Sequence, residues 1–546
     1  MAAKPFSFIG FTFLILFPLL CSPSYAVEIT DPTTPLSPET ICKSTPYPSS
    51  CTSILPKGHK ANVYDSGRFS IRKSLRQSLR LQKLVEMQLL RSSRFSLPTI
   101  RALLDCKYLA SQNVDYLSTC IGTVNKTSKV LRTLEAEELQ TLLSSISTNL
   151  QTCLEGLQTT SSTQNVDKEV LVSLSNDYKL HGVSLALFKS GWKPKHRDAS
   201  ALRPRNHRRF RNGQLPLRMS DKSRAIYEKA LKWRRKLIQE GDEEVVIKDI
   251  VVVSQEGWGN FTTINEAIAA APNNSAASDG YFLIYVAAGE YQEYVSIESN
   301  KKYLFLLGDG LLSILQLLVK SVVAEGFLAV DLTFRNTAGP SKMQAVALRS
   351  GADFSTFYRC SFEGYQDTLY THSKRQFYRE CDIYGTIDFI LGNAAVVLQN
   401  CNIYLRLPIK GQFDPITAQG RTDPNQNTGT SIHNCTIKAA EDLGTTRTYL
   451  GRPWKEYSTV VYMQSFMDGL IESAGWSVWN GDFALSTLYY AEYNNTGPGS
   501  NTSMRVTWPG YHVIGASDAA NFTVSNFLLG DNWLPRTGVP YTGGLI

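Results

Sequence analysis

The spacing of apolar residues divides the chain into two regions with different periods. Between about 39 and 190, apolar residues recur every three or four positions, which is the pattern of a helix with one buried face. Three such series are Ile71, Leu75 and Leu79; Ala110, Val114, Leu117 and Ile121; and Leu139, Leu142, Ile146, Leu150 and Cys153. Successive amphipathic segments of this kind predict an all-α antiparallel helical bundle.

From about 246 to the end, short β-prone runs alternate with Gly and Asn, as in YFLIYVAAG, TFYRCSFEG and QFYRECDIYG. Repeats of 20 to 34 residues are typical of a parallel β-solenoid, in which each coil stacks on the one before it. The sequence therefore predicts that an all-β parallel β-helix follows the helical bundle. The positions expected to mark successive coils are Phe334, Phe362, Ile383, Ile403 and Ile437, separated by 28, 21, 20 and 34 residues.

One of these repeats carries two aspartates in equivalent positions. The skeleton Cys-x-(Phe/Ile)-x-Gly-x-x-Asp occurs twice, 21 residues apart, and ends at Asp367 and then at Asp388. Residues one coil apart lie on adjacent strands, separated by about 4.8 Å. The two carboxylates are therefore predicted to be neighbours, and Cys360 is predicted to stack on Cys381 within disulfide range.

Two glutamines belong to the same predicted column. Gln344 precedes Gln366 by 22 positions, so we expect it on the coil before Gln366. One groove would then hold Gln344, Gln366, Asp367 and Asp388. At about 5 Å and an effective dielectric near 20, two carboxylates repel by roughly 3 kcal/mol, so one should stay protonated while the other ionises.

An anionic nucleophile beside a protonated acid and two carboxamides suits acyl transfer. No serine elbow, histidine cluster or CxxC pair in the sequence competes with this site, and no metal or cofactor is expected. Three alternatives remain open. The aspartates could cap backbone groups in turns, or serve a glycosidase or lyase, since close carboxylates also suit retaining hydrolysis. The chain could also be a non-catalytic wall protein that acts through its helical domain.

The first 26 residues, MAAKPFSFIGFTFLILFPLLCSPSYA, have the features of a secretory signal cleaved after Ala26. No later apolar run is long enough to span a bilayer, so we expect a soluble, secreted protein with no membrane contact after signal removal. Seven N-x-Ser/Thr sequons fit passage through a glycosylating compartment. They are Asn125, Asn260, Asn273, Asn434, Asn494, Asn501 and Asn521.

Residues 191–245 are rich in basic residues and lose the helical period. This stretch is predicted to be a solvated linker, and its run Arg234, Arg235, Lys236 and Leu237 a candidate cleavage site for a processing protease. The net charge of +8 and the pI of about 8.8 favour an acidic partner. Because a secretory signal is present, an extracellular polyanion is expected rather than nucleic acid.

The chain has ten cysteines, of which Cys21 would leave with the signal. The others should mostly pair in an oxidising compartment. Cys42 and Cys51 flank the Pro-rich segment CKSTPYPSSC, and Cys106 and Cys153 lie on different predicted helices that a disulfide could join. The full set expected in disulfides is Cys42, Cys51, Cys106, Cys153, Cys360, Cys381, Cys401 and Cys435.

Several motifs resemble those of plant pectin methylesterases: GPSKMQAVALR, YQDTLY, GTIDFILGNAAVV, AQGRTDPNQNTGTSI, YLGRPWKEYS and WPGYHVI. The segments ICKSTPYPSSC, LLDC and TCLEGL are similar to the pectin methylesterase inhibitor domain. The resemblance implies an inhibitor-like domain over 27–190 and a right-handed catalytic β-helix over 246–546. It implies a monomer whose substrate is methyl-esterified homogalacturonan, an acidic polysaccharide of the cell wall, and whose own inhibitor-like domain is a partner in cis.

Carried over residue by residue, the resemblance makes Asp388 the nucleophile and Asp367 the acid and base. Gln366, with Gln344, would stabilise the oxyanion. Arg452 would orient Asp388, and Trp454 would offer an apolar face to the sugar ring.

The sequence departs from the family pattern in three places. The interval LLSILQLLVKSVVAE, from Leu311 to Glu325, is about fourteen residues shorter than the family segment, which supplies a threonine to the groove. Because a solenoid loses part of a coil less easily than a whole one, we expect local irregularity there and intact stacking downstream. Leu391 replaces the usual phenylalanine, and Cys120 lies outside the four-cysteine pattern of the inhibitor-like region and is expected to be unpaired.

Overall fold

The computed structural model describes residues 31–56, 58, 60–160, 166–195, 205–207, 215–230, 245–310, 313–315 and 319–546. The predicted signal peptide and the basic run from Arg234 to Leu237 lie outside these residues. Among the described residues, no helix combines the length and the apolar composition needed to cross a membrane.

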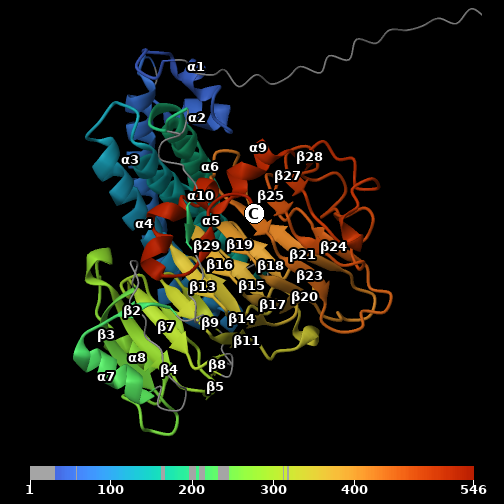
Figure 1. Ribbon diagram of the computed structural model, residues 1–546. Coiled ribbons are helices and arrows are strands. Elements are labelled where there is room, and N and C mark those ends of the chain that lie inside the picture. The colour runs from blue at the N-terminus through green and yellow to red at the C-terminus, as the bar shows by residue number, and fades with distance from the viewer. Residues whose placement is uncertain are drawn as a thin grey trace, which may run out of the picture.

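Four long helices form an antiparallel bundle, which confirms the predicted all-α domain (Figure 1). They are α3 (Val63–Leu90), α4 (Leu97–Val124), α5 (Thr133–Thr160) and α6 (Lys168–Gly191), preceded by the short helices α1 (Pro38–Cys42) and α2 (Pro48–Ile54). Disulfides join Cys42 to Cys51 and Cys106 to Cys153, so the first pair ties α1 to α2 and the second ties α4 to α5. Cys120 is a buried free thiol in the bundle core.

Three parallel sheets, each crossed once per coil, form the second domain, as a parallel β-helix requires. Sheet 1 comprises β2 (Leu217–Arg218), β3 (Val245–Val253), β4 (Tyr281–Val286), β7 (Leu304–Gly308), β10 (Leu328–Val330), β13 (Ser355–Tyr358), β16 (Arg375–Arg379), β19 (Ala395–Gln399), β22 (Gly429–His433), β25 (Thr459–Met463), β27 (Tyr489–Tyr493) and β28 (Tyr511–Val513).

Sheet 2 comprises β5 (Gly289–Tyr291), β8 (Ser313–Leu315), β11 (Thr333–Arg335), β14 (Ser361–Glu363), β17 (Asp382–Gly385), β20 (Asn402–Leu405), β23 (Thr436–Ala439) and β26 (Phe466–Met467). Sheet 3 comprises β6 (Ser296–Ile297), β9 (Val319–Val322), β12 (Leu348–Ser350), β15 (Leu369–Thr371), β18 (Ile390–Gly392), β21 (Asp414–Gln419) and β24 (Thr448–Gly451). Short helices α8 (Ile264–Ala270), α9 (Ala516–Ala519) and α10 (Val524–Phe527) lie near the two ends of this domain's chain segment.

The apolar column predicted from the repeats is one continuous stack inside sheet 2. Strand pairing places Phe334, Phe362, Ile383, Ile403 and Ile437 opposite one another in consecutive coils. The rings of Phe334 and Phe362 are stacked with centroids 5.3 Å apart. All five residues are buried in the largest core cluster, so the coil assignment from sequence is confirmed.

The cysteines of the β-helix do not form the expected disulfides. Cys360, Cys381, Cys401 and Cys435 are buried free thiols that follow one another in four consecutive coils. Residues in register on parallel strands send their side chains in the same direction at the strand spacing, whereas a disulfide needs Cβ atoms about 3.8 Å apart. Each thiol instead faces a backbone carbonyl, as Cys360 Sγ does with Ala329 O at 3.5 Å.

Part of the predicted linker is ordered on the β-helix, which corrects the expectation of a solvated segment. Strand β2 extends sheet 1 beside β3, and α7 (Asp221–Ala230) packs against β3. The ring of Tyr227 meets Tyr285 edge to face at 6.3 Å. Earlier in the same stretch, β1 (Asn206–His207) pairs antiparallel with β29 (Tyr541–Thr542).

The shortened interval still supplies one strand to sheet 2 and one to sheet 3. Strand β8 pairs with β5 and β11, and β9 pairs with β6 and β12. The pairing of β9 with β12 shifts register between Leu348 and Ser350, while β12, β15 and β18 stay in regular register downstream. The irregularity therefore lies just ahead of the coils that carry the two aspartates, as expected.

Candidate active site

Asp367 and Asp388 occupy equivalent turns on adjacent coils, directly before β15 and β18. The pairing of Leu369 with Ile390 sets this relationship. Both aspartates have left-handed backbone conformations, with φ of 63° and 53°, which Asp tolerates better than most residues. Their amide groups donate to the next coil, Asp367 to Ile387 O at 3.1 Å and Asp388 to Pro415 O at 2.7 Å. The stacking of coils thus fixes both side chains on one edge of sheet 3.

Arg452, the residue directly after β24, contacts Asp388 from two coils farther along the domain. Its Nε lies 2.9 Å from Oδ1 and its Nη2 lies 2.7 Å from Oδ2 of Asp388. The guanidinium also lies 4.4 Å from the ring centroid of Trp479 and 5.6 Å from that of Phe413. The sequence reasoning missed both aromatic residues, because no repeat or motif spacing links them to the aspartates.

Burial and mutual charge separate the two carboxyl groups. Burial, reinforced by the charge of Asp388, raises the pKa of Asp367 to about 8 against the weaker pull of Arg452. Burial also raises the pKa of Asp388, but the hydrogen bonds and charge of Arg452 oppose that rise. Near neutral pH, Asp367 therefore keeps its proton. The Arg452 cation contacts Asp388 and favours the ionised form of that carboxyl group.

The two glutamines lie in one column beside this pair, as the sequence predicted. The backbone amide of Ala345 donates to Gln366 O at 3.1 Å, as that of Asp367 donates to Ile387 O, so Ala345 is opposite Asp367 and Gln344 is opposite Gln366. This 22-residue step exceeds the 21-residue register of β12 with β15 by one, because the ladder slips by one residue between Ala345 and Leu348. Gln366 is half-buried and Gln344 is exposed, and neither side chain has a hydrogen-bond partner among the described residues.

Trp454 lies on the outer side of sheet 3. Its ring meets Tyr370 at 6.3 Å and packs over Gly420, where a Cβ would approach the ring to 3.0 Å. Leu391 pairs with Tyr370 in the same outward column of the sheet. These residues form an apolar surface next to the aspartates.

The helical domain covers this outer side of sheet 3. Thr152 on α5 lies 3.0 Å from His372 Nε2, and Asn393 donates to Thr148 at 2.9 Å. Gln426 donates to the backbone of Ser144 at 2.9 Å. With the contact of Asp105 on α4 with Arg349, these bonds place α4 and α5 against the surface that adjoins Asp367 and Asp388.

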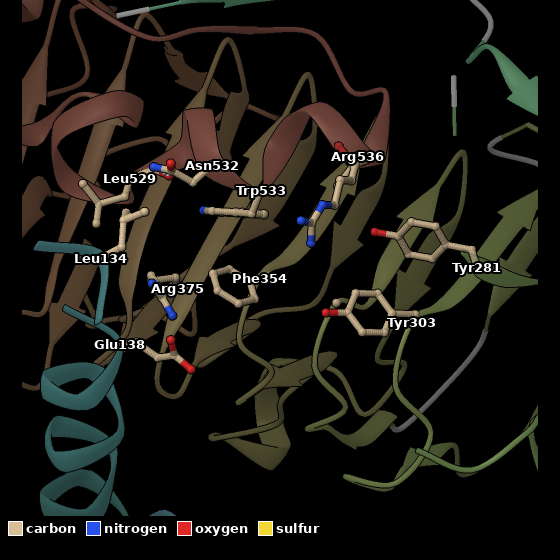
Figure 2. Close-up of a pocket in the computed structure, with 12 residues that line it drawn as sticks. Leu134, Glu138, Tyr281, Tyr303, Phe354, Arg375, Leu529, Asn532, Trp533 and Arg536 are labelled. Atoms are coloured by element: carbon tan, nitrogen blue, oxygen red, sulfur yellow. Dashed lines mark hydrogen bonds between the residues drawn. The ribbon is translucent and has the colours of Figure 1, made fainter. Parts of the chain in front are cut away.

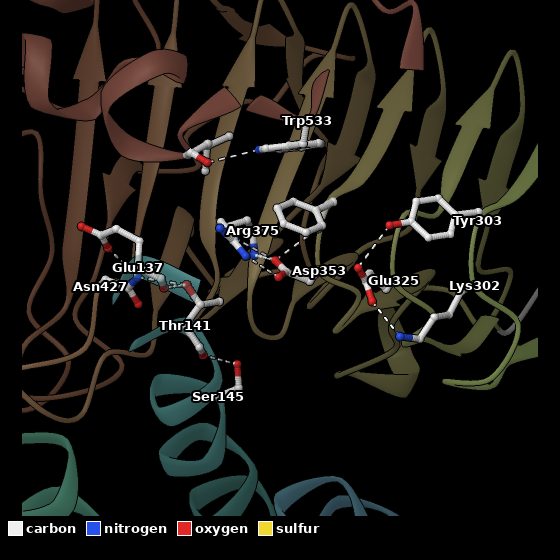
Figure 3. A network of polar contacts seen from close by, with 12 residues as sticks. Glu137, Thr141, Ser145, Lys302, Tyr303, Glu325, Asp353, Arg375, Asn427 and Trp533 are labelled. Atoms are coloured by element: carbon white, nitrogen blue, oxygen red, sulfur yellow. Dashed lines mark hydrogen bonds and ion pairs between the residues drawn. The ribbon is translucent and has the colours of Figure 1, made fainter. Parts of the chain in front are cut away.

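A cavity of about 170 Å³ lies elsewhere, between the start of α5, the coils of sheet 1 and the C-terminal turns (Figure 2). Its walls include Tyr303, Phe354, Arg375 and Trp533. Figure 3 shows that Arg375 is held by Asp353, whose Oδ2 lies 2.6 Å from Nη2. Neither aspartate of the candidate site lines this cavity.

Among the described residues, no group of three or more His, Cys, Asp or Glu side chains is placed to hold a metal ion.

The chain belongs to the pectinesterase family. The Pectinesterase family model matches residues 250–531, and the model of the plant invertase/pectin methylesterase inhibitor matches residues 37–187. The chain is therefore a pectinesterase with an inhibitor domain in the same polypeptide.

Curated relatives and one solved structure agree with this assignment. The chain is 56% identical to probable pectinesterase/pectinesterase inhibitor 7 of Arabidopsis thaliana, over 93% of this chain and 95% of the relative. It is 47% identical to pectinesterase 2 of Citrus sinensis, over 77% and 79% of the two chains. The structure of pectin methylesterase from carrot is similar with a TM-score of 0.52 and 49% identity, covering 54% of this chain and 98% of that one.

Proposed function

We propose that Asp388 is the nucleophile with which this pectinesterase hydrolyses methyl esters of homogalacturonan. The observation that supports this role is the paired contact of Arg452 with Asp388, one coil from the protonated Asp367. A carboxylate held in this way cannot rotate away from an ester that enters the groove, and its neighbour has a proton to give.

In the first half-reaction, an oxygen of Asp388 attacks the ester carbonyl carbon of a galacturonate unit. The carbonyl oxygen becomes an oxyanion that accepts hydrogen bonds from the free carboxamides of Gln366 and Gln344. The carbon–methoxide bond then breaks, the methoxide takes the proton of Asp367, and methanol leaves. Asp388 is now joined to the galacturonate acyl group as an anhydride.

In the second half-reaction, Asp367 is a carboxylate and acts as a base. It removes a proton from water, whose oxygen attacks the galacturonate carbonyl carbon. The bond to Asp388 breaks, which restores its carboxylate, and the galacturonic carboxylic acid that forms loses its proton to solvent, while Asp367 is again protonated. Arg452 keeps Asp388 oriented throughout, and Trp454 packs against the sugar ring.

Product analysis tests this reaction against cleavage of the polymer backbone. Pectin is incubated with the enzyme after its linker has been cleaved and its helical domain removed. Methanol release and polymer length are both measured. We expect methanol release with no shortening of the chain. Shortened chains without methanol would instead indicate a glycosidase or a lyase.

We further propose that the inhibitor domain holds the enzyme inactive until a protease cuts the linker near Arg234–Leu237. This proposal is supported by the cover that α4 and α5 provide over sheet 3. The product would be a secreted, monomeric cell-wall enzyme.

Six predicted sequons are exposed and accessible to glycosylation: Asn125, Asn260, Asn273, Asn494, Asn501 and Asn521. Asn434 is half-buried and donates to Asn400 at 2.9 Å, which makes it the least accessible.

Methanol release before and after cleavage tests this regulation. The full chain should be much less active than the same sample cut in the linker and freed of its helical domain. Equal activity in the two samples would contradict inhibition in cis.

A further inference from the structure

Two ion pairs between described residues join the helical domain to the β-helix. Arg349 on β12 places Nη1 3.0 Å from each carboxylate oxygen of Asp105 on α4. Lys455 forms an ion pair with Glu155 on α5. Neither cation has a carboxylate partner within the described part of the β-helix. When the helical domain leaves, both cations therefore lose their counterions.

These cations flank an aromatic surface beside the proposed catalytic pair. The Arg349 guanidinium lies 5.6 Å from the centroid of the Tyr370 ring, and the Lys455 ammonium lies 4.7 Å from that of Trp454. The two rings are 6.3 Å apart, so the four side chains form one continuous strip, called here the cationic strip. Tyr370 follows Asp367 by three residues on β15, which places the strip next to the groove.

The chemistry of the strip suits an acidic sugar. A galacturonate ring has an apolar face that packs on aromatic side chains, and its carboxylate accepts hydrogen bonds from guanidinium or ammonium groups. A methyl-esterified unit lacks that charge. The neutral hydrogen bonds elsewhere in the domain interface, such as Gln426 with Ser144, show no such arrangement.

We propose that Arg349 and Lys455 bind the free carboxylates of galacturonate units that neighbour the ester being hydrolysed. In the uncut chain, Asp105 and Glu155 occupy the places of those substrate carboxylates. This inference rests on the proposed function, and it adds a preference for substrate that is already partly de-esterified. The helical domain then competes with the substrate through the same two charges.

The test compares binding and kinetics in a polypeptide of residues 215–546, which keeps β2 and α7. The matched carrot enzyme is covered over 98% of its length by 54% of this chain, so a relative folds without a helical domain. The variant is Arg349→Gln with Lys455→Gln. The control is Lys438→Gln, because Lys438 lies 5.1 Å from the ring of Tyr404 on sheet 2, away from the strip. Thermal unfolding confirms that each protein is folded.

Binding of fully de-esterified polygalacturonate is measured by calorimetry at low salt, since this requires no catalysis. We expect the double variant to bind about 10-fold more weakly, the effect of losing two partly buried charge contacts. The control should bind like the parent. Unchanged binding in the double variant would overturn the inference, whatever the enzyme's activity.

Kinetics provide the second measurement. On partly de-esterified pectin, the double variant should lose about 10-fold in kcat/KM, through KM, while kcat stays the same. On highly esterified pectin the loss should be less than about 3-fold, because few free carboxylates are present. An equal loss on both pectins would contradict the inference, whereas a parent enzyme inactive on both would contradict the proposed function instead.

A full-chain variant tests the role of the two acids. Asp105→Asn with Glu155→Gln should raise the methanol-releasing activity of the uncut chain. The control Glu169→Gln removes an exposed ion pair with Arg80 inside the helical domain and should not. An equally inactive double variant that still folds would show that these carboxylates do not compete with the substrate.

Discussion

Arg452 and Asp388 are 64 residues apart in sequence, yet the Arg452 guanidinium donates to both carboxylate oxygens of Asp388. The contact spans successive coils of sheet 3, where β18 pairs with β21 and β21 with β24. The planar guanidinium matches the carboxylate in a way that a lysine cannot. This pair therefore fixes the orientation of the proposed nucleophile.

Replacing Asp388 with Asn should lower kcat for methanol release by about 1000-fold or more, because an amide cannot form the acyl intermediate. The shape of the side chain is almost retained, so circular dichroism and the unfolding temperature should remain close to those of the parent. Asp382→Asn, on sheet 2, is the matched control and should stay active. Parent-like methanol release from folded Asp388→Asn would remove Asp388 from the mechanism.

The activity should fall as the pH rises through about 8, where Asp367 loses the proton that methanol requires. The pH profile of kcat/KM for the cut enzyme measures this limb. A profile that stays flat well above pH 8 would exclude Asp367 as the acid.

The same shift predicts an effect on stability. The pKa of Asp367 is raised from 3.8 to about 8 on folding, so its contribution to stability is complete below about 3.8 and is lost as the pH rises to about 8. Asp367→Asn, which cannot ionise, should therefore gain unfolding temperature relative to the parent between pH 4 and pH 8. A constant difference across that range would show that Asp367 is not shifted.

The stacked cysteines of the β-helix should behave as thiols, although the protein is expected to be secreted. Burial raises the pKa of Cys381 and excludes reagents. A thiol reagent should react with almost no thiol in the folded protein and with five thiols per chain after denaturation. These are Cys120, Cys360, Cys381, Cys401 and Cys435. A count of one thiol after denaturation would show instead that the four cysteines of the β-helix form disulfides, as the sequence suggested.

Residues 215–230 should remain on the β-helix after the linker is cut on either side of them. Tyr227→Ala should lower the free energy of unfolding of the 215–546 polypeptide by about 1–2 kcal/mol, because its ring packs on Tyr285. Lys222→Ala, exposed on the same helix, is the control. Native mass spectrometry after cleavage at engineered sites on both sides of 215–230 should find the peptide still bound, and its quantitative loss would contradict this.

The shortened interval from Leu311 to Glu325 should weaken substrate binding more than chemistry. The register shift between β9 and β12 lies ahead of the proposed catalytic coils, which are regular. Restoring a family-like segment should therefore lower KM and leave kcat nearly unchanged. Equal kcat/KM values for the two proteins would show that the short coil does not damage the groove.

The local patterns of the sequence determined the two domains, the stacking of the coils and the neighbouring aspartates. Each of these follows from a period: three to four residues along a helix, and one coil per strand spacing in a solenoid. The column from Phe334 to Ile437 and the pair Asp367 and Asp388 are therefore visible in the sequence without any long-range information.

The direction of side chains and the contacts between domains were decided only by the tertiary structure. The spacing of the repeats alone did not show that these strands pair in strict register, so that Cys360 and Cys381 point in parallel and stay reduced. Nor could it place Trp479 against Arg452, or Asp105 against Arg349, because these residues come from segments with no common repeat. Such contacts depend on how loops and whole domains pack, and packing is set by the complete fold rather than by local spacing.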